Sequence, residues 1–114
     1  MHLDKDKITV SLVNVLGNAA KYTPAGGRVA MRVTVSEGKL TVVVEDTGIG
    51  IAAEELPRIS TKFFRSADPR VREQPGSGLG LSLVKEVVRI HGGSLDIASE
   101  LNRGTTIHIV LPIM

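Results

Sequence analysis

The chain has 114 residues, of which 42% are hydrophobic and 23% charged, so it has the size and composition of one globular domain and not of a disordered chain. The net charge of +2 and the pI of about 9.2 are only a weak hint of an anionic partner. With one Tyr, two Phe and no Trp, no stacking platform for nucleic acid is expected. There is no Cys for disulfide or thiolate chemistry. No apolar run approaches the ~20 residues that span a bilayer. We therefore expect a soluble, cytosolic domain without membrane contact of its own.

The first predicted element is a helix over residues 4–22, which Asp4 or Asp6 can cap. Pro24 and the two glycines that follow it end the helix. Its apolar residues recur at helical spacing and predict the buried stripe. These residues are Ile8, Leu12, Val15, Leu16 and Ala19.

Two strands and a short helix are predicted next. Residues 28–35 are rich in β-branched residues and lead through a hairpin turn into residues 40–45, which are apolar enough for a central strand. The segment 52–56 predicts a short helix that Pro57 limits.

Residues 58–79 are basic, contain Pro and Gly, and show no sustained period. A loop of this length is uncommon in a compact domain and is usually either functional or disordered. A helix over 79–91 follows, with Leu79, Leu83, Val87 and Ile90 on one face and Leu81, Val84 and Val88 widening it. Two alternating strands, 94–99 and 105–111, complete the chain. The order predicts an α+β fold, a two-layer sandwich with a mixed, mostly antiparallel sheet covered by helices on one face.

A polar row on the first helix is the first candidate site. Asn14, Asn18 and Lys21 fall at i, i+4 and i+7 and so share a face. Carboxamide oxygens beside an ammonium suit a hydrated Mg²⁺ that carries phosphates, because Mg²⁺ takes few protein ligands and keeps its waters. Taken alone, an Asn-x-x-x-Asn row is better explained as a solvated helix face.

The second candidate, Asp46-Thr-Gly48-Ile-Gly50, leaves the end of a strand. Asp46 can accept a hydrogen bond from an exocyclic amine such as the adenine N6, and the glycines let the backbone approach a flat ligand. The segment also matches the dinucleotide fingerprint G-x-G-x-x-A. We reject a dinucleotide oxidoreductase, because a crossover helix and a parallel strand do not follow.

The third candidate, Gly76-Ser-Gly78-Leu-Gly80-Leu, opens a helix, where freed N–H groups and the helix dipole favour an anion. It lacks the Gly-Lys-Ser/Thr ending of a Walker loop. In the loop before it, Phe63 and Phe64 either fold over a nucleotide or fill the core.

The three histidines indicate no transition-metal site. His91 is interpreted as a favourable cation at a helix C-terminus, and His108 is interpreted as pointing outward.

Taken together, five segments in this order resemble the catalytic ATP-binding domain of two-component sensor histidine kinases. They are Asn14-x3-Asn18-Ala-x-Lys-Tyr-Thr-Pro, Asp46-Thr-Gly-Ile-Gly, Phe63-Phe-Arg, Gly76-Ser-Gly-Leu-Gly-Leu and Gly104-Thr-Thr before a strand ending Leu-Pro. The resemblance covers residues 5–112 and implies the Bergerat ATP-binding sandwich, one domain over residues 1–114, and an ATP lid at about 58–79.

The resemblance also implies residue roles. Asn18 would ligate Mg²⁺ with Asn14 beside it, Lys21 and Arg65 would reach phosphates, and Tyr22 would line the adenine and ribose. Asp46 would bind the adenine amine, Gly48 and Gly50 would make room for the base, and Thr106 would complete the pocket's hydrogen bonds. Asn14, Lys21 and Arg65 are thus the expected catalytic residues, and the remaining nucleotide contacts are Ile51, Phe64, Gly76, Gly78, Leu79, Gly80 and Leu81.

The family transfers phosphate to a histidine on a separate helical hairpin, which none of the three histidines here resembles. The resemblance therefore implies an isolated, monomeric domain that binds Mg-ATP and acts on that hairpin of the same kinase, with a response regulator as an indirect partner. Such a kinase can be cytosolic or the cytosolic part of a membrane-bound sensor. In hydrolysing relatives a Glu stands at the position of Asn14; a carboxamide cannot act as a general base, so slow hydrolysis is expected.

Two alternatives remain from the same superfamily. One is a degenerate module that binds nucleotide only to regulate a partner, which the presence of every motif disfavours. The other is an anti-sigma-type serine kinase, which the Lys-Tyr-Thr-Pro run and the Phe-Phe-Arg segment disfavour.

Overall fold

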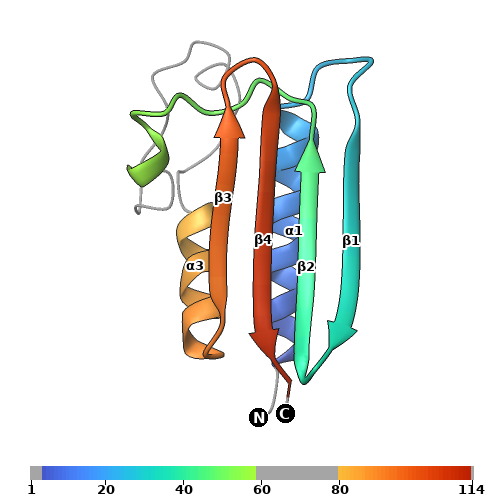
Figure 1. Cartoon of the computed structure of the whole chain (residues 1–114), viewed down its shortest axis with the longest axis vertical. Helices are drawn as coiled ribbons and strands as arrows, with labels where there is room; N and C mark the ends of the chain where they lie inside the picture. Colours follow the sequence, from blue (N-terminus) through green and yellow to red (C-terminus); the bar gives the residue numbers. More distant parts are fainter. Residues whose placement is uncertain (1–3, 59–79, 114) are drawn as a thin grey trace.

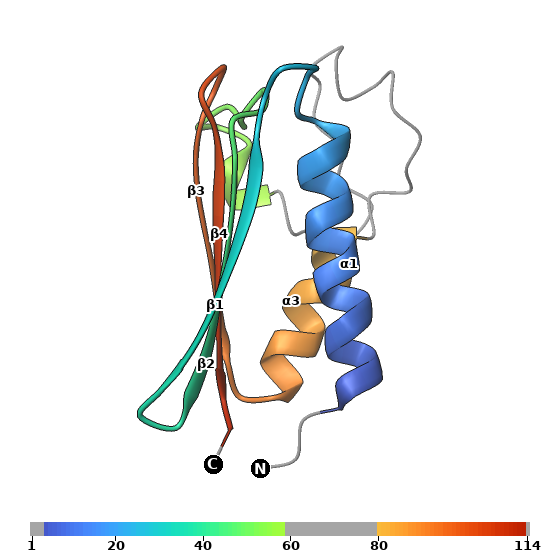
Figure 2. The same cartoon turned by 90° about the vertical axis from the view of Figure 1, so that its right-hand side faces the viewer.

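The described part of the chain is a two-layer sandwich in which one sheet carries helices α1 and α3 on a single face. A computed structural model describes residues 4–58 and 80–113. Figure 1 shows the sheet in front of helices α1 (Lys5–Lys21) and α3 (Gly80–Ile90), and Figure 2 shows the two layers from the side. The predicted α+β class and its two-layer arrangement are confirmed.

The sheet has the order β1-β2-β4-β3, and every pairing among these strands is antiparallel. The expected parallel component of a mixed sheet is therefore wrong for the described strands. Hairpins join both neighbouring pairs, and the last strand inserts beside β2, which makes β2 central as predicted. The strands are β1 (Val29–Ser36), β2 (Lys39–Asp46), β3 (Ser94–Glu100) and β4 (Gly104–Pro112).

Helix α1 begins as its sequence predicts. Asp4 is the N-cap, and its side chain accepts a hydrogen bond from the backbone N–H of Lys7 at 3.1 Å. The predicted apolar stripe faces the sheet: Val15 and Ala19 are buried, while Ile8, Leu12 and Leu16 pack around the core.

The core lies between the helices and the alternating apolar side chains of the central strands. Val42 and Val44 of β2 stand opposite Ile109 and Ile107 of β4, and directly opposed residues project to the same face. The buried residues of this core are Val15, Ala19, Val42, Val44, Val84, Val88, Ile107, Ile109 and Leu111.

Two local predictions are wrong. The segment after β2 contains turns and the 3-10 helix η1 (Leu56–Arg58) in place of a helix over 52–56, because Pro57 sits inside that tighter turn instead of ending an α-helix. In α3 the buried residues are Val84 and Val88, whereas Leu83 and Ile90 are about half exposed. The apolar stripe of α3 is wider than its contact with the sheet, so periodicity alone misplaced its centre.

Candidate nucleotide-binding site

The helix-facing side of the sheet changes from apolar to polar at one end. Asp46 of β2, Thr105 of β4 and Ser99 of β3 follow the buried aliphatic residues on the same face, because Asp46 is paired with Thr105 and Thr105 with Ser99. The Ser99 Oγ and Thr105 Oγ1 atoms are 2.8 Å apart. The apolar core therefore ends in a row of three hydrogen-bonding side chains.

Asp46 is held by backbone donors on one of its two oxygens. Oδ1 accepts hydrogen bonds from the N–H of Gly48 at 2.8 Å and of Thr105 at 3.2 Å. Oδ2 makes no hydrogen bond to any of residues 4–58 and 80–113, and the side chain is half-buried. The carboxylate is thus fixed in orientation, while Oδ2 remains an acceptor without a donor among the described residues.

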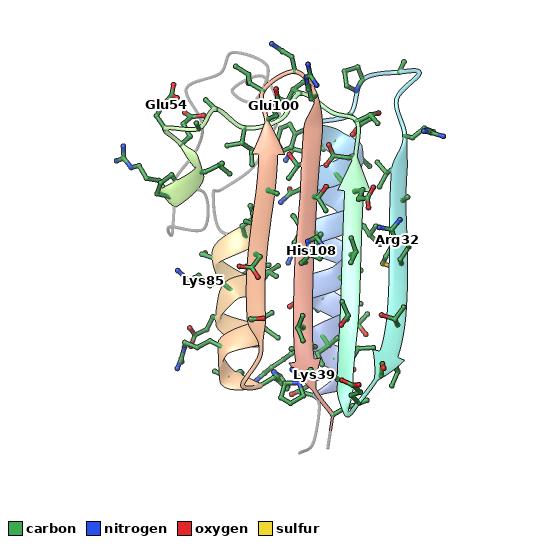
Figure 3. All side chains as sticks on the ribbon, viewed as in Figure 1. Arg32, Lys39, Glu54, Lys85, Glu100 and His108 are labelled. Carbon is green, nitrogen blue, oxygen red and sulfur yellow. The ribbon has the colours of Figure 1, made fainter. Side chains whose placement is uncertain are left out.

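The loop after Asp46 is tied to the neighbouring turn. The N–H of Ile51 donates to Ser99 Oγ at 2.8 Å, and Asn102 donates its N–H to the carbonyl oxygen of Ile49. Gly50 has φ +71°, and a Cβ there would overlap the carbonyl oxygen of Glu100. Figure 3 places Glu100 at this end of β3. Gly50 is therefore required by the packing of the chain itself, in addition to any role beside a ligand.

Gly48 is buried and also crowded, since a Cβ on it would lie 2.5 Å from the Tyr22 carbonyl oxygen. A Cβ on it would lie 2.8 Å from Asp46 Oδ1 and 3.0 Å from Thr23 Oγ1. A side chain at this position would push against the carboxylate that the loop holds in place. Gly48 thus keeps Asp46 in its orientation.

The structure does not place Thr106 on the face of the sheet that carries Asp46, and its expected role in the pocket stays a prediction. Thr106 pairs with Glu45, whose side chain lies on the open face of the sheet, away from the helices, as does that of the exposed His108 (Figure 3). Its neighbour Thr105 is the residue beside Asp46. The sequence reasoning missed Thr105. The alternation of β4 already grouped Thr106 with the outward-facing His108, and this indicated that Thr105 lies on the helix-facing side.

The end of α1 packs against the same loop. Tyr22 is the C-cap residue, and its carbonyl oxygen accepts the N–H of Ile49 at 3.1 Å. The Lys21 ammonium lies 5.2 Å from the centre of the Tyr22 ring, within the range of a cation–π contact. These contacts bring the predicted residues Lys21 and Tyr22 next to the Asp46 loop.

Asn14 and Asn18 are half-buried on the flank of α1 that carries Ser11. Ser11 is buried and, with Val87 and Val88 of α3, lines one small cavity. The asparagine row therefore continues along the side of α1 that is directed toward α3. This places the predicted oxygen ligands on the side of α1 that is directed toward α3 and not on an outer, fully solvated face.

Helix α3 begins at Gly80, the last glycine of the predicted phosphate loop, and Leu81 after it packs against the core. Leu81 is thus a packing residue in this structure. The other predicted contacts on this part of the chain, Phe64, Arg65, Gly76, Gly78 and Leu79, lie outside the described residues.

Comparison with known proteins assigns the class of domain. The family model described as histidine kinase-, DNA gyrase B-, and HSP90-like ATPase matches residues 3–114, so the chain belongs to this family.

Sensor histidine kinases are among its relatives. Sensor histidine kinase WalK of Bacillus subtilis (strain 168) is 40% identical over 114 residues, which are 98% of this chain and 19% of WalK. The structure of the mycobacterial sensor histidine kinase MprB matches with a TM-score of 0.84 and 44% identity, over 96% of this chain and 74% of the MprB chain. Full-length ShkA, solved in complex with AMPPNP, matches with a TM-score of 0.81 and 30% identity, over 96% of this chain and 22% of ShkA.

The chain is thus the ATPase-type catalytic domain found in sensor histidine kinases, and family membership implies ATP binding. It spans about a fifth of the length of the curated relatives that it matches. No helix within residues 4–58 and 80–113 has the length and apolar character needed to cross a membrane.

Proposed function

We propose that the chain binds Mg-ATP between the Asp46 loop and the asparagine row of α1 and supplies the γ-phosphate to a histidine on a separate domain. The observation that carries the proposal is the half-satisfied Asp46 carboxylate. Two backbone N–H groups fix Oδ1 and leave Oδ2 as an oriented acceptor. The 6-amino group of adenine is a donor of matching chemistry.

The side chains along α1 are suited to the phosphate end of the nucleotide. Asn14 and Asn18 offer two neutral amide oxygens from successive turns, and Lys21 adds a positive charge one turn further on. This donor set fits Mg²⁺, which commonly keeps several waters and takes its other oxygens from phosphates. In the proposed site Asn18 would ligate the Mg²⁺ with Asn14 beside it, and the cation would supply neutralisation of phosphate charge.

The proposed reaction is phosphoryl transfer from ATP to an imidazole. The bond between the γ-phosphorus and the bridging oxygen breaks, its electron pair leaves with ADP, a nitrogen–phosphorus bond forms, and the imidazole proton passes to solvent water. Asn14 has no basic group with which to activate water at neutral pH. The site therefore positions ATP for a nucleophile on another domain, which we propose to be the histidine-bearing helical hairpin of the same kinase.

Two further roles belong to this proposal. The phosphorylated hairpin then serves a response regulator, so that the chain acts on the regulator only indirectly. The domain works on the cytosolic side, where ATP is supplied. The AMPPNP complex of ShkA supports the nucleotide part of the proposal.

The test mixes the purified chain with a purified histidine-bearing hairpin and γ-labelled ATP. We expect label on the hairpin that is lost in acid and kept in base, as for phosphohistidine, and no label with the Asn18→Ala variant. ATP binding without any transfer would favour the regulatory, non-catalytic alternative. Acid-stable label on a serine would favour the serine kinase alternative.

A further inference from the structure

His91 joins the end of α3 to the beginning of α1. Its imidazole is buried, with 6% of the residue exposed. Nε2 lies 3.0 Å from the backbone nitrogen of Asp4, the N-cap of α1, and Nδ1 lies 2.7 Å from the carbonyl oxygen of Val87. One side chain therefore connects a backbone group of α3 with the N-cap of α1, and His91 and Asp4 are 87 positions apart in the sequence.

These two partners determine the protonation of the ring. A backbone N–H can only donate, so Nε2 accepts and carries no hydrogen. The hydrogen is then on Nδ1, which donates to the Val87 carbonyl. His91 is thus a neutral imidazole in this fold, and its interpretation as a cation at the helix C-terminus is wrong.

The carbonyl groups at the end of α3 have other donors that make such a cation unnecessary. Gly92 has φ +72° and donates its N–H to the Arg89 carbonyl at 3.0 Å, and Gly93 donates to the Val88 carbonyl at 2.9 Å. This pair of bonds is a Schellman motif, which satisfies the last carbonyls of a helix. The imidazole is therefore available for a link between helices.

The bond to Asp4 sets the position of α3 along α1. The helices are antiparallel, since the end of α3 meets the beginning of α1 (Figure 2). The eleven residues of α3 rise about 16 Å at ~1.5 Å per residue, so α3 begins roughly level with residue 15 of α1. The N–H groups that open α3 thus lie at the height of Asn14 and Asn18.

We propose that His91 is a positioning residue for the nucleotide site, acting through the Asp4 N–H from the opposite end of the two helices. The inference depends on the proposed ATP site. When the bond is lost, α3 can shift along α1, and the N–H groups at its start no longer stay level with the asparagine oxygens. ATP affinity then falls although His91 touches no nucleotide.

Two substitutions separate the two bonds of the imidazole. In His91→Gln the amide oxygen is the same number of covalent bonds from Cα as Nε2, so it can still accept the N–H of Asp4. In His91→Asn the amide nitrogen is the same number of covalent bonds from Cα as Nδ1, so this variant keeps only the hydrogen bond to Val87. His108→Gln on the open face is the matched control, since His108 is exposed and far from the helix layer.

Calorimetric titration with Mg-ATP, at a temperature where circular dichroism shows each variant folded, gives the readout. We expect His91→Asn to weaken binding by about 2- to 30-fold, the usual range for a coupled residue without ligand contact. The His91→Gln and His108→Gln variants should stay within about twofold of the unsubstituted chain. Equal affinities for the two His91 variants would overturn the inference.

If the His91→Asn chain does not fold, the donor can be removed instead. Asp4→Ala and Asp4→Pro both lose the carboxylate cap, but only the proline variant loses the N–H, and the φ of −82° at Asp4 is close to that of proline. Weaker ATP binding by Asp4→Pro than by Asp4→Ala supports the inference, and equal binding overturns it.

A nitrogen-15 NMR spectrum separates this inference from the proposed function. His91 should show a hydrogen on Nδ1 and none on Nε2, and the Asp4 amide should exchange slowly in the unsubstituted chain and faster in His91→Asn. A hydrogen on Nε2 would refute the bridge itself. Absence of ATP binding by the unsubstituted chain would refute the proposed function and, with it, the positioning role, while leaving the bridge intact.

Discussion

Asp46→Asn separates the structural role of Asp46 from its proposed role in recognising adenine. The Asn oxygen can still accept the N–H groups of Gly48 and Thr105, so the loop should keep its conformation. The amide nitrogen replaces Oδ2 and places a donor opposite the adenine amino group. Loss of one charge-assisted hydrogen bond is worth about 1.5–3 kcal/mol, so ATP binding should weaken roughly 10- to 140-fold.

Inosine triphosphate provides the complementary ligand, because it carries an oxygen where adenine carries the amino group. The substituted amide can donate to that oxygen, so the preference for ATP over inosine triphosphate should shrink or reverse in Asp46→Asn. Calorimetric titration with both nucleotides measures the ratio. An unchanged ratio, or ATP affinity equal to that of the unsubstituted chain, would refute the role of Asp46 Oδ2.

Asp46→Ala is the control for the structural part. It removes the acceptor of two partly buried backbone N–H groups, and each unsatisfied group costs about 1–3 kcal/mol. Chemical denaturation should therefore show a clear loss of stability for Asp46→Ala and a small one for Asp46→Asn.

Three further predictions follow from the site. Thr105→Val removes the hydroxyl that contacts Ser99 and should lower the free energy of unfolding by about 1 kcal/mol, whereas Thr106→Val should change it by less than about 0.5 kcal/mol. Equal losses in urea unfolding would contradict the placement of Thr105 and Thr106 on opposite faces of the sheet. Gly50→Ala should cost at least about 1 kcal/mol because of its left-handed backbone and the adjacent Glu100 carbonyl, and a melting temperature equal to that of the unsubstituted chain would count against this. Asn14→Glu introduces a possible general base, so ATP hydrolysis measured by phosphate release should rise, and unchanged turnover would count against the proposed role of Asn14.

The elements with clear periodicity were predictable from the sequence. The helix at Asp4–Tyr22 has an N-cap, a continuous apolar stripe and a terminating Pro-Gly segment, and these local signals agree with its packing. The alternation of the last strand likewise predicted which side chains are buried. The antiparallel pairing of the four described strands depends on contacts between distant segments, which local patterns do not encode.

The segments that form the candidate site were predictable from the sequence, but the orientation of single side chains within them was less so. Tyr22 contacts the loop that follows Asp46, and Lys21 lies over the Tyr22 ring, because Lys21, Tyr22 and Asp46 lie at the ends of well-predicted elements; their roles toward a nucleotide stay predictions. Thr105 was missed because the Gly104-Thr-Thr motif was matched by sequence alone, without asking which of the two threonines faces the helices. The link through His91 was out of reach, since it joins residues that only the packing of α1 against α3 brings together.

The most direct test of the central claim is the pattern of amide NMR shifts when Mg-ATP is added to the unsubstituted chain. The account predicts that the largest changes among residues 4–58 and 80–113 fall on Asn14, Asn18, Asp46 and Gly48, with Arg32 and His108 on the open face unaffected. Changes centred on the open face, or no changes at saturating Mg-ATP, would contradict it.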